Sequence, residues 1–267
     1  MARIGLVAGA GGLPSVFAKR ARERGDTVIA FGLVGITDKG LESCVDKMHW
    51  FEFGNLKKAL FLAAMDRIQK IILLGKLNKD LFYKKAEALD TEAKKFLGKN
   101  IDKKDYSILN EVTKVLKNVG IEVLDSTTYM EDLLPARGVL TKRSPSGPES
   151  DDIEYARTVA KEIARFDVGQ TVVVKDKNVI AVEGAEGTDE TIKRSGAISK
   201  GGFTVVKVSR PDQDMRFDVP LVGIDTLRIL IEAGGKVLAL EEKKVFLINS
   251  EEMVMLADEK DVSIVVV

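Results

Sequence analysis

Acidic and basic side chains gather in one short stretch of the chain, between residues 207 and 218. Three aspartates alternate there with three basic residues: Asp212, Asp214, Asp218, Lys207, Arg210 and Arg216. Carboxylate oxygens are the ligands that Mg²⁺ prefers, and neighbouring cations can pair with phosphate oxygens. A metal held in this way neutralises phosphate charge and activates water. The stretch therefore favours Mg²⁺-assisted phosphoryl chemistry, with a solvated charged loop as the alternative.

A glycine-rich turn near the N-terminus is a second candidate, for binding phosphate. Gly9, Gly11 and Gly12 follow a short apolar run and precede a helical pattern. Such a turn directs backbone N–H groups and the helix dipole at an anion. The dinucleotide-binding fingerprint is incomplete, because Pro14 occupies its third glycine position and the second strand ends at Leu33 without the ribose-binding acid. A tight structural turn is the alternative interpretation.

A third candidate lies where a predicted strand passes through glycines into a helix. Thr188 is the predicted N-cap there, and Asp189 stands in the first turn. Acids at that position stabilise the helix dipole, so capping competes with a role of Glu183 or Asp189 in binding substrate or a cation. Lys76 follows the strand predicted at 71–74, at the edge where an open parallel sheet presents ligand groups, although a surface lysine fits equally well.

Composition excludes several classes of protein. The 267 residues include 41 Lys and Arg against 41 Asp and Glu, so no net field attracts a polyanion such as nucleic acid. The single cysteine, Cys44, cannot form an internal disulfide, which fits a reducing cytoplasm. The single histidine, His49, excludes multi-histidine metal centres, and its aromatic neighbours favour a packed side chain over a catalytic base. No apolar stretch is long enough to span a bilayer.

The first half of the chain alternates short apolar runs with helical patterns. This alternation predicts a Rossmann-like α/β domain with a parallel sheet over residues 1–132. Pro14 and Gly25 are expected to mark the start and end of the first helix, and Asn55 is expected to cap the second. The prolines and glycines of 133–150 predict a linker.

The second half, residues 151–267, is predicted to be an α+β domain. A helix is expected over 151–164, because apolar residues recur there at a helical spacing. Two hairpins are expected after it, the first joining 170–175 to 179–183 and the second joining 237–240 to 245–248.

Six motifs in this order resemble the UDP-2,3-diacylglucosamine pyrophosphatases of the LpxI type, and the resemblance covers nearly the whole chain. The motifs are Ile4-Gly-Leu-Val-Ala-Gly-Ala-Gly-Gly-Leu-Pro14, Leu74-Gly-Lys76, Ala136-Arg-Gly-Val-Leu-Thr141, Phe166-Asp-Val-Gly-Gln170, Val182-Glu-Gly-Ala-Glu-Gly-Thr-Asp189 and Pro211-Asp-Gln-Asp-Met-Arg-Phe-Asp-Val-Pro-Leu-Val-Gly223. The last two blocks are the most specific.

The resemblance implies a Mg²⁺-dependent enzyme of Gram-negative lipid A synthesis. Such an enzyme hydrolyses UDP-2,3-diacylglucosamine to UMP and 2,3-diacylglucosamine 1-phosphate, with the substrate between two tethered domains. It works in the cytoplasm, where an amphiphilic substrate can bring it into peripheral contact with the inner membrane. No nucleic-acid partner is implied, and a homo-oligomer is left open.

The resemblance also implies roles for individual residues. Family catalysis depends on an aspartate of the last block, which matches Asp214 or Asp218 and leaves the choice between them open; both are also the predicted metal ligands. The residues expected to bind substrate are Gly9, Gly11, Gly12, Lys76, Glu186, Thr188, Asp189, Lys207, Gln213 and Arg216. Two alternatives remain, an NAD-dependent nucleotide-sugar oxidoreductase or epimerase and a non-catalytic regulator that binds nucleotide or lipid.

Overall fold

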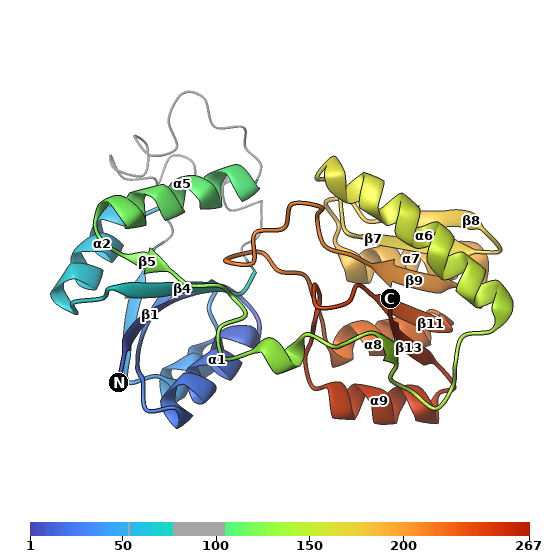
Figure 1. Ribbon diagram of the computed structural model, residues 1–267, viewed down its shortest axis with the longest axis horizontal. Coiled ribbons are helices and arrows are strands. Elements are labelled where there is room, and N and C mark those ends of the chain that lie inside the picture. Colours follow the sequence, from blue (N-terminus) through green and yellow to red (C-terminus); the bar gives the residue numbers. More distant parts are fainter. Residues whose placement is uncertain (53, 77–104) are drawn as a thin grey trace. The chain divides into compact units, whose positions relative to one another are not determined.

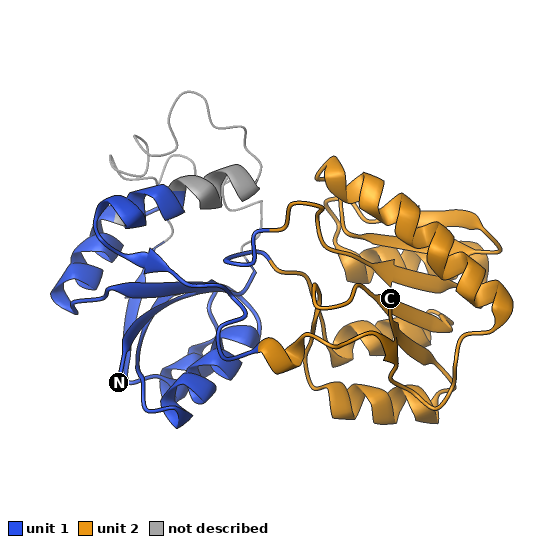
Figure 2. Cartoon of the chain, viewed as in Figure 1, with its two compact units in different colours: residues 1–130, 214–218 blue, residues 131–213, 219–267 orange. Residues whose placement is uncertain are grey.

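The chain folds into two units, seen in a computed structural model that describes residues 1–52, 54–76 and 105–267 (Figure 2). Unit 1 comprises Met1–Met130 together with Asp214–Asp218. Unit 2 comprises Glu131–Gln213 and Val219–Val267. A short segment from the second half of the sequence therefore packs with the first half.

Unit 1 is built on a five-stranded parallel sheet of strand order β3-β2-β1-β4-β5. Its strands are β1 (Arg3–Ala8), β2 (Thr27–Leu33), β3 (Lys47–Phe51), β4 (Lys70–Leu74) and β5 (Glu122–Val123). The central strand β1 pairs with β2 and β4, so that Ile4 lies opposite both Val28 and Lys70. The predicted parallel sheet of a Rossmann-like α/β domain is confirmed.

Local signals position the helices of unit 1, which in its described residues are α1 (Leu13–Glu23), α2 (Leu56–Met65) and α5 (Asp105–Asn118). Pro14 lies in the first turn of α1, and Gly25 follows that helix with φ +83°. The Asn55 side chain accepts the N–H of Lys58 at 3.2 Å and caps α2. Figure 1 shows α1 on one side of the sheet and α2 with α5 on the other. The predicted helix starts and stops are confirmed.

Unit 2 contains a six-stranded mixed sheet of order β6-β13-β11-β9-β7-β8. Its strands are β6 (Gly138–Val139), β7 (Thr171–Lys175), β8 (Asn178–Val182), β9 (Thr204–Lys207), β11 (Val237–Leu240) and β13 (Ser263–Val266). Strands β9, β11 and β13 are parallel, whereas β7 runs antiparallel to β9 and to β8. The first predicted hairpin is confirmed, and Asp176 and Lys177 form its left-handed turn.

The second predicted hairpin is wrong. Strand β11 has parallel neighbours on both sides, β9 and β13. Strand β12 (Phe246–Leu247) pairs instead with β10 (Leu221–Val222), also parallel, in a separate two-stranded sheet. All four residues of β11 are buried, as is typical of a central parallel strand covered on both faces.

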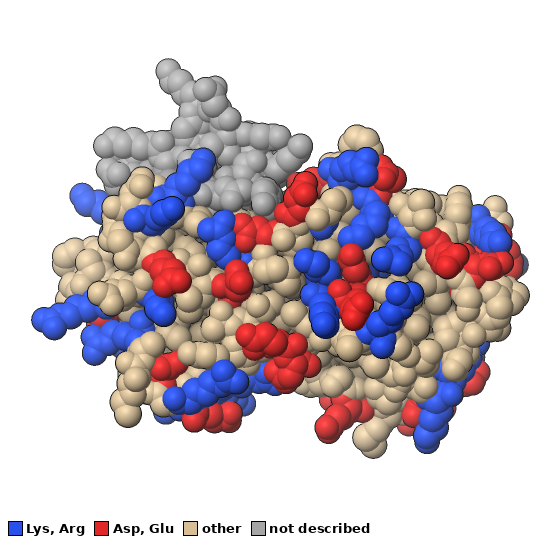
Figure 3. All heavy atoms as spheres, viewed as in Figure 1, with Lys and Arg blue, Asp and Glu red and all other residues tan. Residues whose placement is uncertain are grey.

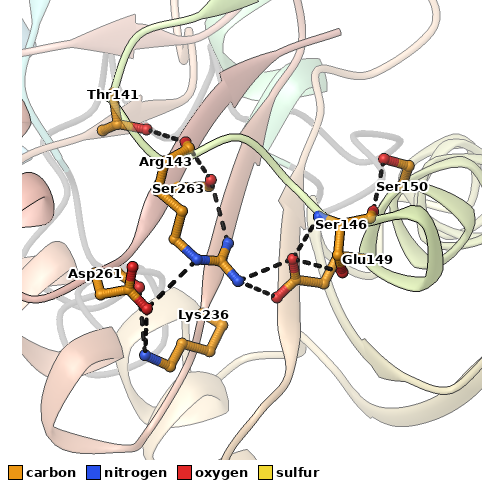
Figure 4. A network of polar contacts seen from close by, with 8 residues as sticks. All are labelled: Thr141, Arg143, Ser146, Glu149, Ser150, Lys236, Asp261 and Ser263. Atoms are coloured by element: carbon orange, nitrogen blue, oxygen red, sulfur yellow. Dashed lines mark hydrogen bonds and ion pairs between the residues drawn. The ribbon is translucent and has the colours of Figure 1, made fainter.

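Helix α6 (Gly147–Arg165) begins earlier than the predicted Asp151. Glu149 explains the earlier start, because its carboxylate accepts the Ser146 N–H at 2.8 Å and the Ser146 hydroxyl at 2.9 Å. The same carboxylate binds Arg143 at 2.7 and 3.0 Å (Figure 4). Arg143 also donates to Ser263 of β13 at 3.3 Å, which ties the start of α6 to the sheet.

The other helices of unit 2 are α7 (Thr188–Ser199), α8 (Ile224–Glu232) and α9 (Ser250–Glu259). The described part of the chain also has short 3-10 turns at η1 (Lys39–Cys44) and η3 (Glu131–Leu133). One face of the sheet packs on α6, with Ala156 and Ala160 against Val206. The opposite face packs on α7 to α9, with Ile192, Leu227 and Met253 in one buried cluster. Both faces of the sheet are thus covered, so ligand groups are left to its edges.

Charge is mixed over the surface. On the face drawn in Figure 3, lysines and arginines alternate with aspartates and glutamates in both units. Within the described ranges, no helix combines the length and the apolar character needed to cross a bilayer.

Candidate functional site

Unit 1 has a candidate site at the carboxyl edge of its sheet. From β1 the chain continues to β2 and β3 on one side of the sheet, and β4 and β5 lie on the other side. Open α/β sheets bind ligands at such a reversal of strand order, which here lies between β1 and β4. The chains leaving these two strands are joined there. Ala10 and Lys76 exchange backbone hydrogen bonds, each 2.9 Å long. The predicted glycine turn and Lys76 therefore lie at one edge, as expected.

The three glycines of the turn differ in their surroundings. A Cβ on Gly9 would lie 2.6 Å from the Lys76 carbonyl oxygen, so this glycine permits close contact between two backbones. Gly11 has φ +96° and is exposed, and Gly12 is the exposed N-cap of α1. No atom lies within 4 Å of a Cβ added to either. Gly9 thus has a packing role, while substrate binding by the turn stays a prediction.

We expect Gly9→Ala to lower the free energy of unfolding by about 1–3 kcal/mol, because the added methyl meets backbone that cannot move cheaply. Gly12→Ala is the matched control. It has room for the methyl and a helical φ of −79°, so its stability should stay within about 0.5 kcal/mol of wild type. Urea unfolding of the two variants measures both values, and equal stabilities contradict the assignment.

The Asp214–Asp218 segment is anchored at the same edge. Ser126, which follows β5, donates its backbone N–H to the Met215 carbonyl at 2.7 Å. Its hydroxyl bonds to the Arg216 carbonyl at 2.7 Å and to the Leu73 carbonyl of β4 at 3.3 Å. Ser126 is buried, so these bonds tie the acidic segment to the ends of β4 and β5.

Within the segment, Asp214 and Arg216 form a bidentate ion pair. Arg216 Nε lies 2.9 and 3.0 Å from the two carboxylate oxygens, and its Nη2 bonds the second of them as well. The Arg216 backbone N–H also donates to Asp214 at 3.0 Å. The hydrogen bond from the guanidinium holds the pKa of Asp214 below its usual value of 3.8. Asp214 is therefore a fixed anion at neutral pH.

Metal binding by Asp214 and Asp218 stays a prediction. Both oxygens of Asp214 are engaged by Arg216, and Asp218 is an exposed residue with a left-handed backbone. Among the residues that the structure describes, no three His, Cys, Asp or Glu side chains are grouped to hold a metal ion. Mg²⁺ is commonly held by one or two carboxylates together with waters and substrate phosphates, so Asp214 and Asp218 stay predicted metal ligands.

Unit 2 has its own candidate site, a buried polar cluster that we call the Lys207 cluster: Thr171, Glu183, Thr188 and Lys207. Lys207 ends β9, and its Nζ donates to Thr188 at 2.6 Å and to Thr171 at 3.2 Å. Thr188 in turn donates to Glu183 at 2.8 Å. The side chain of Lys207 is 7% exposed and that of Glu183 is 12% exposed, with 3.9 Å between their charged atoms.

Glu183 stays ionised in this cluster. Burial alone would raise its pKa, but the positive charge of Lys207 and the hydrogen bonds of the two threonines hold the pKa below 4.5. The cluster therefore joins an anion and a cation at the edge where β9 ends and α7 begins. The structure brings Thr188 and Lys207 together, and the N-cap of α7 is Gly187 and not the predicted Thr188. Substrate binding by Thr188 and Lys207 stays a prediction.

The other predicted substrate residues of unit 2 lie outside the Lys207 cluster. Asp189 accepts the hydroxyl of Thr226 at 2.8 Å. Glu186 accepts from Arg194 at 2.8 Å and from Thr191 at 3.2 Å. Gln213 donates its backbone N–H to the Arg210 carbonyl at 3.3 Å. Substrate binding by these three residues stays a prediction.

Two further ion pairs at this edge were not predicted from the sequence. Glu241, which follows β11, pairs with Lys161 of α6 at 2.5 Å and accepts both the N–H and the hydroxyl of Ser209, at 2.7 and 2.9 Å. Arg210 pairs with Asp167 at 2.8 Å. Asp167 belongs to a motif of the family resemblance and was therefore the signal available in the sequence.

Stability of unit 2 should decrease in acid. Glu149, Glu183 and Glu241 each have a pKa below 4.5, because hydrogen bonds and cations outweigh the effect of burial. In the unfolded chain these groups take up protons at higher pH than in the folded protein, so stability is full above about pH 5 and is lost as pH falls through the lowered values. Chemical denaturation at pH 7, 5 and 4 measures the trend; constant stability contradicts it.

His49 has a structural environment. Its Nε2 bonds to Asp66 at 2.5 Å, and its ring lies 5.5 Å from that of Phe31. The interpretation as a packed histidine is confirmed.

Comparison with known proteins decides the family. The LpxI N-terminal domain description matches residues 3–133, and the LpxI C-terminal domain description matches residues 136–265. The chain belongs to the LpxI family. A relative from Caulobacter vibrioides, the UDP-2,3-diacylglucosamine pyrophosphatase LpxI, is 28% identical and covers 97% of this chain and 95% of its own. The family expected from the motifs is confirmed, as is the expectation of an enzyme of that family.

Two solved structures show a distant likeness to this chain. A pyruvate carboxylase from Rhizobium etli is 13% identical, with a TM-score of 0.29, over 67% of this chain and 16% of that chain. The N5-carboxyaminoimidazole ribonucleotide synthetase of Thermotoga maritima is 14% identical, with a TM-score of 0.28, over 70% of this chain and 42% of that chain. At these scores neither likeness carries a conclusion about function.

Proposed function

We propose that this LpxI-family chain hydrolyses UDP-2,3-diacylglucosamine to UMP and 2,3-diacylglucosamine 1-phosphate, a step of lipid A synthesis. The observation that carries the proposal is the match of both family domains along nearly the whole chain, together with the activity for which the Caulobacter relative is named.

The reaction adds one water across a P–O–P bond. A P–O bond forms to the water oxygen, the bridging P–O bond breaks, and the water protons leave to a base or to solvent. The chain must therefore hold a dianionic diphosphate and orient a water beside it. Arg216 suits the first task, because a guanidinium has five N–H donors that match phosphate oxygens. An aspartate of the Asp214–Asp218 segment suits the second as a hydrogen-bond acceptor for the water.

The glycine turn and Lys76 at the unit 1 edge support binding of the phosphates. The turn precedes α1, whose N-terminal dipole favours an anion, and Lys76 is an exposed cation beside it. The Arg216 backbone is tied to the same edge through Ser126. These groups together supply positive charge where the order of the strands reverses.

Mg²⁺ dependence stays a prediction that rests on the resemblance, and no step above passes through the metal. Activity measured after removal of metal with EDTA, and again after addition of MgCl₂, tests it. We expect activity to be lost and restored, and full activity in EDTA contradicts the dependence.

The place of action follows from the substrate. Two acyl chains anchor UDP-2,3-diacylglucosamine to a membrane, while its nucleotide stays in water. We propose that the chain works in the cytoplasm and reaches its substrate by peripheral contact with the inner membrane. Cosedimentation with vesicles that contain the substrate tests this contact.

Purified protein incubated with UDP-2,3-diacylglucosamine or with UDP-N-acetylglucosamine tests the activity. We expect release of UMP from the acylated substrate only. Binding of the acylated substrate without release of UMP supports the regulator instead. A change of NAD fluorescence with turnover supports the oxidoreductase or epimerase.

A further inference from the structure

Two partly buried ion pairs hold consecutive residues just after β9. The first fixes Ser209 through Glu241, whose side chain is 13% exposed, with Lys161 as the counter-ion. Lys161 also donates to the Ser209 carbonyl at 3.2 Å. The second fixes Arg210 through Asp167. The side chains of Arg210 and Asp167 are 14% and 15% exposed, close to the value for Glu241. Ser209 itself is 1% exposed.

Asp167 is held for this contact by an unusual backbone. Its φ is +56°, a left-handed conformation that few residues other than glycine, asparagine and aspartate adopt readily. Its neighbours Phe166 and Val168 are 70% and 49% exposed, so the turn between α6 and β7 is not held in place by apolar packing of these side chains. Backbone hydrogen bonds from Asp167 to Ala164 and from Val168 to Ile163 close the turn, and the ion pair joins its side chain to Arg210.

The fixed residues lie close in sequence to the proposed chemistry. Residues 211–213 alone separate Arg210 from Asp214, which limits the distance between their Cα atoms to at most about 14 Å. Pro211 further restricts this connection, because its ring fixes φ. The position of Arg210 therefore limits where the Asp214–Asp218 segment can begin.

We propose that Asp167 and Glu241 are positioning residues for the Asp214–Asp218 segment: they hold Arg210 and Ser209 and so set the start of the connection that leads into it. They contact neither substrate nor reacting atoms. This inference rests on the proposed function for its kinetic consequence, but its structural consequence does not depend on any activity.

The test compares Asp167→Asn with Asp176→Asn. Asparagine keeps the shape of aspartate and tolerates the left-handed backbone, so the first variant removes only the charge that holds Arg210. Asp176 also has a left-handed φ, +51°, but is exposed in the β7–β8 turn at the other end of the strands. The control therefore has the same chemical change and the same backbone class.

Two readouts are used. The first is kcat and KM for UMP release. The second is the rate at which trypsin cleaves after Arg216, identified by mass spectrometry of the fragment that begins at Phe217. Phe217 is 1% exposed, so this bond should be cut slowly while the segment is held. Trypsin does not cut after Arg210, because proline follows.

We expect Asp167→Asn to lower kcat about 10- to 100-fold with KM changed less than about threefold, and to raise the cleavage rate several-fold. Asp176→Asn should match wild type in both. Glu241→Gln is the second variant and should behave like Asp167→Asn; it decides the outcome if Asp167→Asn does not fold.

The proposal is overturned if Asp167→Asn or Glu241→Gln, folded with a wild-type unfolding midpoint, keeps both the wild-type cleavage rate and the wild-type kcat. It is also overturned if kcat falls while cleavage after Arg216 stays slow. Should wild type release no UMP, the proposed function fails while the cleavage rates still decide the positioning role.

Discussion

Replacement of Asp214 or Asp218 by Asn is expected to lower kcat for UMP release, by about 10³-fold in at least one of the two variants. Asn keeps the size of the side chain but removes the negative charge and the second acceptor oxygen. An aspartate that orients water or stabilises the transition state loses that role, whereas a solvated loop residue loses nothing.

The two variants should differ in KM. Asp214→Asn also removes the charge of the bidentate ion pair with Arg216. The guanidinium should then be held less firmly, so the KM for the substrate should change. Asp218→Asn leaves that pair intact, and asparagine tolerates its φ of +54°. Asp212→Asn, an exposed residue just outside the segment, is the control and should keep wild-type kcat. Full activity in both the Asp214 and the Asp218 variant refutes the assigned catalytic role.

Lys207→Met should destabilise unit 2 by about 3–5 kcal/mol at pH 7, because it leaves the buried Glu183 carboxylate without its cation. The pKa of Glu183 should then rise, since burial is no longer outweighed. The loss should therefore shrink as pH falls and Glu183 becomes protonated. Denaturant unfolding at pH 7 and pH 5 measures the difference between the variant and wild type.

A surface lysine is the control for this change. Lys193→Met removes an exposed pair with Glu190 on α7 and should leave the free energy of unfolding close to that of wild type. The double variant Lys207→Met with Glu183→Gln should recover part of the stability, because neither buried charge remains. Equal effects of the two lysine variants contradict the argument that the Lys207 cluster is buried and coupled.

Local signals in the sequence predicted the parallel sheet and its helix ends. Pro14, Gly25 and Asn55 act through their own backbone or through groups a few residues away, so their meaning can be read without the fold. The pairing of 237–240 with 245–248 was wrong for the opposite reason. Strand partners are chosen across the whole unit, and β11 is flanked by β9 and β13 rather than by the nearest apolar run.

The candidate site was predicted in part. Asp214, Arg216 and Lys207 stand out by type and spacing, and the resemblance supplied the order of the motifs. The hydrogen bond between Ser126 and Arg216 joins residues 90 apart in sequence. Asp167 contacts Arg210, 43 residues away, and Glu241 contacts Ser209, 32 residues away. Such contacts depend on the tertiary fold, so no local pattern in the sequence predicts them.

The most direct measurement of the proposed activity follows the phosphorus atoms of UDP-2,3-diacylglucosamine by ³¹P NMR during incubation with purified protein. We predict that the two diphosphate signals disappear together while two monophosphate signals, UMP and 2,3-diacylglucosamine 1-phosphate, grow in equal amounts. Persistence of the diphosphate signals, or their conversion into those of free UDP, would contradict pyrophosphate hydrolysis by this chain.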